Sequence, residues 1–276
     1  MTSTAVRLSR IERQVLRVQP SSPVVPADPV AFAQSLDIEP DAWQAVALRS
    51  SSRRQLWLAC RQSGKSMTAA IAALHTALTV PGSLTLMVSP SQRQSGLLYR
   101  TVRDLAQRLP TRIGMVEDTA TSMTFDSGSR VVSLPGSGQT IRGYSAPDLV
   151  IEDEAAFVAD ETHHAIRPML AVSGGRLLLL STPWGRRGHL WDLWDAGGDD
   201  WERVRITADE VPRIPRAFLE TEWRTLPPLV YQSEYMCVFN ETVDSVFRSD
   251  DIFAAIDPMI VPLFGATRAA EIHARA

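Results

Sequence analysis

The sequence has few cysteines, no long apolar run and no excess of basic residues. Cys60 and Cys237 are the only two cysteines, which is too few for a disulfide framework and is compatible with a reducing compartment. No apolar segment approaches the roughly 20 residues that a membrane-spanning helix needs. Because the net charge is −3, any contact with nucleic acid has to come from a local basic patch. These absences predict a cytoplasmic protein with no membrane segment.

The length of 276 residues fits either one large α/β domain or one domain plus appendages. We interpret residues 1–35 as an N-terminal arm and linker. Residues 1–19 have the pattern of a short amphipathic, basic helix, which is either a docking arm or a contact for DNA or a partner protein. Residues 36–247 form the predicted folded domain. Residues 248–276 are loosely patterned and form the predicted C-terminal tail.

The strongest local signal lies at residues 56–66, LWLACRQSGKS. The apolar start predicts a buried strand, and the residues that follow predict a helix. A helix N-terminus offers unpaired N–H groups and a positive dipole end to a phosphate. Gly64 would let the backbone approach the phosphates, Lys65 would reach the β- and γ-phosphates, and Ser66 would bind Mg²⁺. This context predicts a phosphate-binding loop, although the strict pattern has glycine in place of Ala59.

A second apolar strand ends in acidic residues. Residues 149–151, LVI, lead into Glu152, Asp153 and Glu154. One carboxylate at a strand end can hold Mg²⁺, and the next can orient an attacking water or accept its proton. Consecutive strand residues point to opposite faces, so such a pair has to lie where the strand ends and the backbone turns. We therefore predict Asp153 as the metal ligand and Glu154 as the catalytic base.

Further polar positions fit the same site. Gln44 lies on a predicted helix, and its amide can hydrogen-bond an adenine edge in two places. Arg142 ends a glycine-rich loop, from which a guanidinium can reach a phosphate of its own chain or of a neighbour. Ser181 and Thr182 follow a third apolar strand, residues 176–180, where they are either γ-phosphate sensors or an ordinary strand terminus.

The order of these segments predicts the fold class. Three apolar strands each end in a loop with candidate site residues, so we expect an α/β fold whose mainly parallel sheet carries its chemistry at the strand C-termini. Residues 122–125 and 130–134 flank an Asp-Ser-Gly-Ser turn and predict a β-hairpin. His163 and His164 lack zinc-ligand spacing and partners, so we interpret them as structural or surface residues.

The chain resembles the ATPase half of the large terminase subunits of tailed bacteriophages, the motors that package DNA into proheads. Arg61 within the phosphate loop is typical of that family, which also has Ala or Ser where other P-loop NTPases have the first glycine. The resemblance covers roughly residues 36–247. The matching segments are DAWQ (41–44), CRQSGKS (60–66), MVSP (87–90), LVIEDEAAF (149–157), LLLSTPWG (178–185) and YQSEYMCVFNETVDSVF (231–247).

The resemblance implies a RecA/ASCE-like P-loop NTPase that hydrolyses ATP with Mg²⁺. It implies that Gln44 reads adenine and that Ser181 and Thr182 couple hydrolysis to movement. Either Arg61 or Arg142 would act as an arginine finger, which contributes on the order of 10³ or more in rate. The implied nucleotide-binding loop residues are Arg61, Gln62, Ser63, Gly64, Lys65 and Ser66, the implied metal residues Ser66 and Asp153, and the implied water-activating residue Glu154.

The resemblance also implies partners: double-stranded DNA, a portal protein and a small terminase subunit, in the host bacterial cytoplasm. The assembled form would be a homo-oligomeric ring, a pentamer, and the isolated chain could be a monomer. The family usually continues into an RNase H-like nuclease, for which the acidic residues after residue 247 are too few, so we expect no DNA cleavage by this chain. Two alternatives stay open: a DEAD-like helicase ATPase, and a prophage remnant that binds nucleotide without turnover.

Overall fold

The computed structural model describes residues 25–109, 114–136 and 141–241, and the structural statements below concern those residues. The chain divides into two units, residues 1–240 and 241–276, and the first unit is described here. Most of the predicted N-terminal arm and all of the predicted C-terminal tail lie outside the described residues. No helix in the described part is long and apolar enough to cross a membrane.

An eight-stranded sheet runs through the centre of the described unit, in the order β3-β4-β5-β2-β6-β7-β1-β8. Neighbouring strands from β5 to β8 are parallel, whereas β3, β4 and β5 pair antiparallel. The predicted mainly parallel sheet and the predicted hairpin are both confirmed. The strands are β1 (Arg54–Ala59), β2 (Leu84–Ser89), β3 (Met115–Asp118), β4 (Ser122–Phe125), β5 (Arg130–Pro135), β6 (Leu149–Asp153), β7 (Arg176–Ser181) and β8 (Glu202–Ile206).

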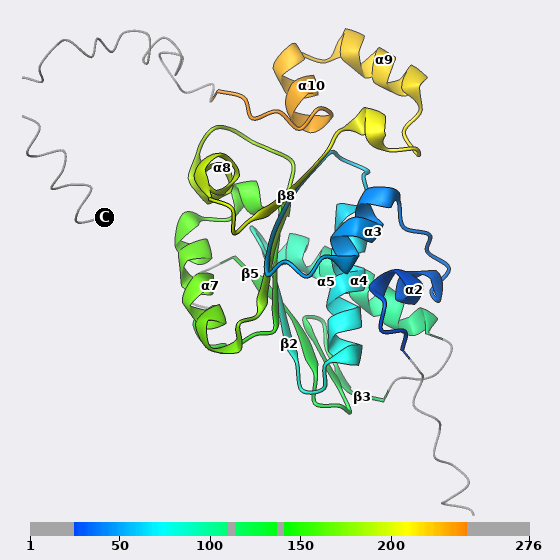
Figure 1. Ribbon diagram of the computed structural model, residues 1–276, viewed down its shortest axis with the longest axis vertical. Coiled ribbons are helices and arrows are strands. Elements are labelled where there is room, and N and C mark those ends of the chain that lie inside the picture. Colours follow the sequence, from blue (N-terminus) through cyan, green and yellow to red (C-terminus); the bar gives the residue numbers. More distant parts are fainter. Residues whose placement is uncertain (1–24, 110–113, 137–140, 242–276) are drawn as a thin grey trace, which may run out of the picture. The chain divides into compact units, whose positions relative to one another are not determined.

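Helices cover both faces of the sheet (Figure 1). We call the side of α2 to α5 the α4 face and the side of α7 and α8 the α7 face. Side-chain alternation along β6 separates the two layers, since Leu149 and Ile151 join the α4-face core and Val150 joins the other. The helices are α2 (Pro29–Gln34), α3 (Ala42–Arg49), α4 (Lys65–Thr79), α5 (Gln92–Arg108), α7 (Asp160–Ser173), α8 (Gly188–Ala196), α9 (Arg216–Thr225) and α10 (Pro228–Glu234), with 3-10 turns η1 (Ala155–Phe157) and η2 (Ala208–Glu210).

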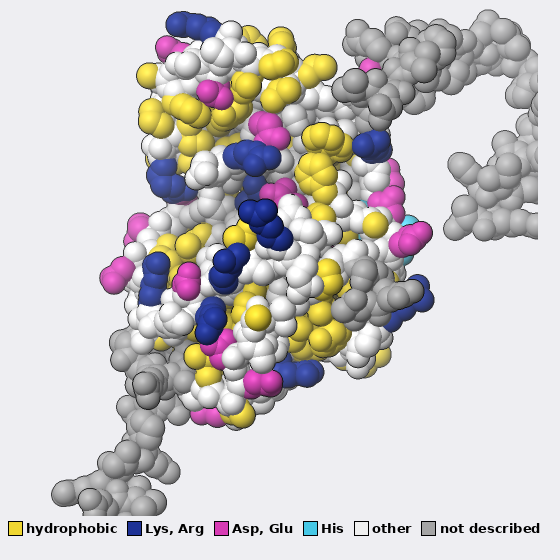
Figure 2. All heavy atoms as spheres, turned by 180° about the vertical axis from the view of Figure 1, so that it is seen from behind, with side chains coloured by type: hydrophobic (Ala, Val, Ile, Leu, Met, Phe, Trp, Pro, Cys, Tyr) yellow, Lys and Arg dark blue, Asp and Glu magenta, His cyan; other side chains and the backbone are white. Residues whose placement is uncertain are grey.

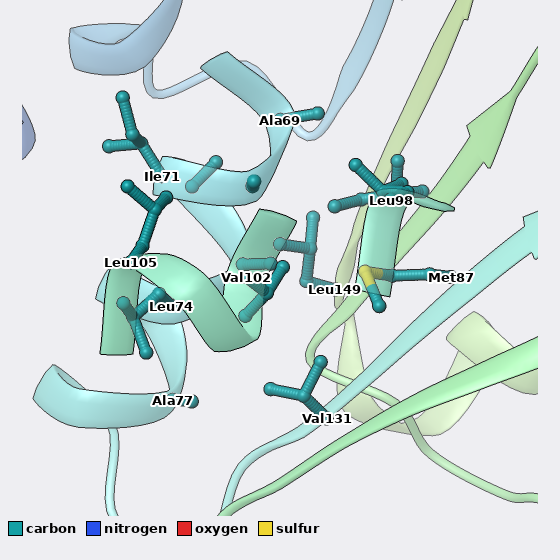
Figure 3. Close-up of a cluster of buried hydrophobic side chains, with 14 of the residues drawn as sticks. Ala69, Ile71, Leu74, Ala77, Met87, Leu98, Val102, Leu105, Val131 and Leu149 are labelled. Carbon is teal, nitrogen blue, oxygen red and sulfur yellow. The ribbon is translucent and has the colours of Figure 1, made fainter. Parts of the chain in front are cut away.

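The α4-face core is built from α4 and α5 against the sheet, as Figure 3 shows with Val102 of α5 beside Leu149 and Val131 of the strands. Helix α2 also belongs to this core because its Phe32 side chain is fully buried. The packed unit therefore begins before residue 36. The periodicity of residues 91–109 predicts that Leu97 and Leu98 both point inward. Leu98 is buried in the core as predicted, but Leu97 is about half exposed.

After β8 the chain leaves the sheet, forms α9 and α10, and returns to the phosphate loop. The Ala208 N–H donates to the Tyr235 carbonyl and the Arg61 N–H donates to the Glu234 carbonyl. This segment carries an apolar patch, visible at the upper end of the space-filling view (Figure 2). The large exposed apolar side chains of this patch are Phe218, Trp223, Leu229 and Val230.

Candidate functional site

The predicted phosphate loop connects β1 with α4. Helix α4 begins at Lys65, whose side chain is buried, and Gly64 caps it with φ +88°. Gln62 also has positive φ, which is uncommon outside glycine. A Cβ atom on Gly64 would lie 2.4 Å from the Gln44 Nε2 atom, so both the backbone angle and the close approach require glycine here.

Two side chains from distant segments hold the carbonyl of Ser63 in this loop. The Gln44 Nε2 atom donates to it at 3.1 Å, while the Gln44 Oε1 atom accepts from the Asp41 N–H at 2.8 Å. Arg213 donates to the same carbonyl at 3.0 Å and pairs with Asp41 at 2.6 Å. Arg213 lies 150 residues from Ser63 in the sequence and stands in no motif, so the sequence alone does not predict this contact. The predicted adenine-reading Gln44 is thus placed against the phosphate loop.

Strand β6 delivers the acidic pair to the carboxyl edge of the sheet. Asp153 is buried on the α4 face, where burial and the neighbouring Glu154 charge raise its pKa to about 7 and the Lys65 ammonium opposes that rise. Glu154 has a left-handed backbone, φ 53°, and its N–H donates to Asp153 Oδ1 at 3.1 Å. A strained backbone such as that of Glu154 is frequent at functional sites. Ser66, the other predicted metal ligand, follows Lys65 in the first turn of α4.

The neighbouring strands contribute three polar side chains. Strand β7 lies beside β6, and the Ser181 hydroxyl at its end accepts a hydrogen bond from the Ala156 N–H at 3.2 Å. Thr182 is buried next to it. Ser89 ends β2 on the other side of β6, and strand alternation places it on the face of Asp153. Its buried hydroxyl has no hydrogen-bond partner among the described residues, a signal that sequence alone does not carry.

The two candidate arginines lie in different surroundings. The Arg61 Nε atom pairs with Glu234 Oε2 of α10 at 2.5 Å, and this hydrogen bond raises the Arg61 pKa. Arg142 is exposed and lines a cavity of about 560 Å³ with α7 rather than with the phosphate loop. The α7 residues of that cavity include Glu161, His164 and Met169.

The α7 face of β6 holds a buried carboxylate that the predictions did not use. Glu152 is fully buried, and its two oxygens accept hydrogen bonds from His163 Nδ1 at 2.9 Å and His189 Nε2 at 3.1 Å. His163 is thus a buried structural residue, one of the two interpretations made from the sequence, and its hydrogen-bond partner Glu152 was not predicted. His164, one residue along, is exposed as expected for a surface residue.

The chain is similar to the large terminase subunits of several bacteriophages. The chain is 26% identical over 265 residues to the terminase large subunit of Thermus phage G20c, covering 83% of this chain and 53% of the relative. It thus spans about half the length of that relative. The large terminase ATPase domain of Thermus phage P74-26 has a TM-score of 0.64 at 22% identity, covering 76% of this chain and 97% of that chain. The HK97 large terminase gives a TM-score of 0.58 at 16% identity, covering 90% of this chain and 51% of that chain.

These solved structures show the fold, a P-loop NTPase sheet with helices on both sides. A family model describes the N-terminal part of T4-type large terminase subunits, and it matches residues 56–253 of this chain. That stretch includes the phosphate loop, the acidic strand and the Ser181 strand end. The chain therefore belongs to the family of terminase large subunits, as a representative of its N-terminal domain.

Proposed function

We propose that this chain hydrolyses ATP to drive double-stranded DNA into a viral procapsid. The proposal is carried by one observation: buried Lys65 at the start of α4 and buried Asp153 at the end of β6 interact electrostatically, with Glu154 one residue beyond. A buried acid whose pKa is raised, next to a phosphate loop, is typical of a site that awaits a ligand. The family membership supports the same function.

Each residue has a definite role in this proposal. The N-terminus of α4 and Lys65 bind the phosphates. Gln44, whose amide is bonded to Ser63 and Asp41, reads the adenine base in this proposal. Glu154 orients the attacking water and accepts its proton. The hard oxygen donors Ser66 and Asp153 fit Mg²⁺, which would neutralise charge on the β- and γ-phosphates when bound. Because the Asp153 carboxylate has no side-chain donor among the described residues, it is free to serve as such a ligand.

The larger assembly is part of the proposal. We expect a ring of identical chains, in the host cytoplasm, that works with a portal protein and a small terminase subunit. The apolar patch on α9 and α10 supports a subunit contact, since exposed apolar clusters mark interaction sites. Within that ring, Arg61 or Arg142 acts as the arginine finger.

The decisive experiment compares ATP hydrolysis by the wild-type chain, with and without DNA, and by Glu154→Ala. We expect the variant to bind ATP but to lose at least about 100-fold in turnover, because it lacks the water-orienting carboxylate. Glu117→Ala on the exposed strand β3 is the control and should keep its rate. Equal rates for Glu154→Ala and wild type would contradict the role of Glu154. Binding without any turnover would favour the remnant alternative, and strand separation would favour the helicase.

A mixing experiment separates the two arginines. Arg142→Ala and Glu154→Ala are each expected to be inactive alone if Arg142 serves a neighbouring site. Mixed, they should regain part of the activity, because an intact Glu154 in one chain meets an intact Arg142 from the next. Failure to regain activity, together with loss of activity in Arg61→Ala, would assign the finger to Arg61.

A further inference from the structure

A buried hydrogen-bonded network lies directly behind the acidic end of β6. Glu152 accepts from His163 of α7 and from His189 of α8. His189 also contacts Asp160, whose Oδ1 atom accepts from the His189 ring at 3.0 Å and from the His189 N–H at 2.8 Å. The network therefore joins one strand to the first turns of two helices.

His189 lies between the two carboxylates of this network. Both ring nitrogens of His189 face carboxylates, so the ring is doubly protonated and lies between two negative groups. Burial opposes ionisation of both partners, but the hydrogen bonds outweigh it, lowering the pKa of Glu152 and raising that of His189. The hydrogen bonds that His163 and His189 donate to its two oxygens therefore hold the Glu152 carboxylate in one orientation.

The same three side chains could be taken for a metal site, since their ligand atoms lie within 4.8 Å of one another. The ring geometry opposes this. The His163 and His189 rings are stacked, with centroids 4.3 Å apart and planes 11° apart. An imidazole lone pair lies in the plane of its ring, so two stacked rings do not direct their lone pairs at one ion. The geometry fits hydrogen bonding to Glu152 instead.

We propose that Glu152, His163 and His189 are positioning residues that fix the catalytic end of β6 from the α7 face. Glu152 precedes Asp153, and the two side chains point to opposite sides of the sheet. Movement of Glu152 would displace the backbone that carries Asp153 and Glu154. Helix α8 follows the Ser181–Thr182 segment, so His189 ties that segment to β6 as well. The role rests on the proposed function of Asp153 and Glu154.

Paired substitutions test this role. His163→Asn and His189→Gln keep a donor near the original ring nitrogen, whereas His163→Leu and His189→Leu remove it. We expect the leucine variants to lose about 10- to 100-fold in kcat with KM for ATP changed less than about twofold, because the phosphate loop is untouched. The amide variants should keep most of the wild-type kcat.

A matched control separates positioning from general destabilisation. Ile166→Ala removes a buried side chain of α7, three residues after His163, and should lower stability while keeping kcat. A kcat loss in Ile166→Ala as large as in the leucine variants would overturn the proposal.

Hydrogen exchange of the segment 149–158 tests the same role without ATP turnover. Exchange should rise in the leucine variants and stay at the wild-type level in the amide variants. Unchanged exchange in the leucine variants would overturn positioning even if the chain does not hydrolyse ATP. Stoichiometric zinc in the purified protein, lost in His163→Leu, would also overturn it in favour of a metal site.

Discussion

Two neighbouring carboxylates on β6 differ in almost everything but their burial. Asp153, on the α4 face, accepts one hydrogen bond from the described residues, donated by the Glu154 N–H, and its pKa is raised to about 7. Glu152, on the α7 face, accepts from two histidines and its pKa is lowered. A buried charge without a partner is costly, and one with hydrogen-bonding partners is tolerated. The comparison distinguishes a site built to receive a ligand from a completed internal contact.

The largest expected effect on stability comes from substituting Glu152, the hydrogen-bonded carboxylate on the α7 face. Glu152→Ala should lower the free energy of unfolding by about 3–5 kcal/mol, because it leaves His163 and His189 without their shared partner in the interior. Urea unfolding measures this. The matched control is Glu161→Ala, at an exposed position of helix α7, which should change stability by no more than about 0.5 kcal/mol. If Glu152→Ala were equally mild, the network on the α7 face would not be the stabilising contact described here.

The acid on the other face should behave in the opposite way. With chelator present at pH 8, Asp153→Asn should raise the free energy of unfolding by about 1–3 kcal/mol, because it removes an ionised buried group, while turnover is lost. In the native state the Asp153 pKa of about 7 exceeds its ordinary value of 3.8, so the native chain binds more protons between these pH values. Wild-type stability therefore falls as pH rises through this window.

The stability gained by Asp153→Asn depends on pH, because wild-type stability falls as Asp153 ionises. It should be full above pH 7, shrink as pH falls below 7 and vanish near pH 4, where both states of the wild type hold the proton. Thermal unfolding at several pH values in chelator measures it. A variant less stable than wild type at pH 8 would mean that Asp153 is already satisfied within the chain.

The same two carboxylates show which features of the site can be predicted from the sequence and which cannot. The strand, the turn after it and the candidate role of Asp153 could be predicted, because local apolar runs and a strand-loop-helix order are encoded within ten or fifteen residues. The partners of Glu152 could not. His163 and His189 come from helices after two different strands, and only the tertiary fold brings them together. Arg213 was missed for the same reason, since its contact with Ser63 spans 150 residues.

Side-chain direction was the other source of error. The periodicity of α5 predicts that both Leu97 and Leu98 face the core, but only Leu98 is buried. The adjacent histidines of α7 divide in the same way, with His163 buried and His164 exposed. The pattern of apolar residues predicts the buried face of a helix to within about one position. Which single residue points inward is decided by packing against the neighbouring layer.

A smaller effect separates two serines that end strands beside β6. Ser181→Ala removes the acceptor of the Ala156 N–H and should cost about 1 kcal/mol. Ser89→Ala removes a buried hydroxyl without a partner among the described residues and should be neutral or slightly stabilising in the absence of nucleotide. Chemical unfolding of both variants measures the difference. Equal losses would show that Ser89 already has a partner, such as an ordered water, and that the α4 face is more complete than described.

The smallest expected effect concerns the two cysteines, and it tests whether the α7 face is closed. Cys60 begins the phosphate loop, yet its side chain packs in the α7-face core, and burial raises its pKa to about 11. Cys237 lies in the same core with a pKa raised to about 12. Since the thiolate is the reactive form, fewer than about 0.1 thiols per native chain should react with a thiol reagent at pH 8.

Denaturant should release both thiols, and ATP with Mg²⁺ should leave the native count unchanged, because the nucleotide is expected on the opposite face. Cys237→Ser is the matched variant, and it should halve the denatured count without altering the native one. Rapid reaction of one thiol in native Cys237→Ser would identify Cys60. Because Cys60 is bonded through its N–H to the Ile206 carbonyl of β8, such a reaction would mean that the phosphate loop opens toward the α7 face. The two sides of the sheet would then not be independent.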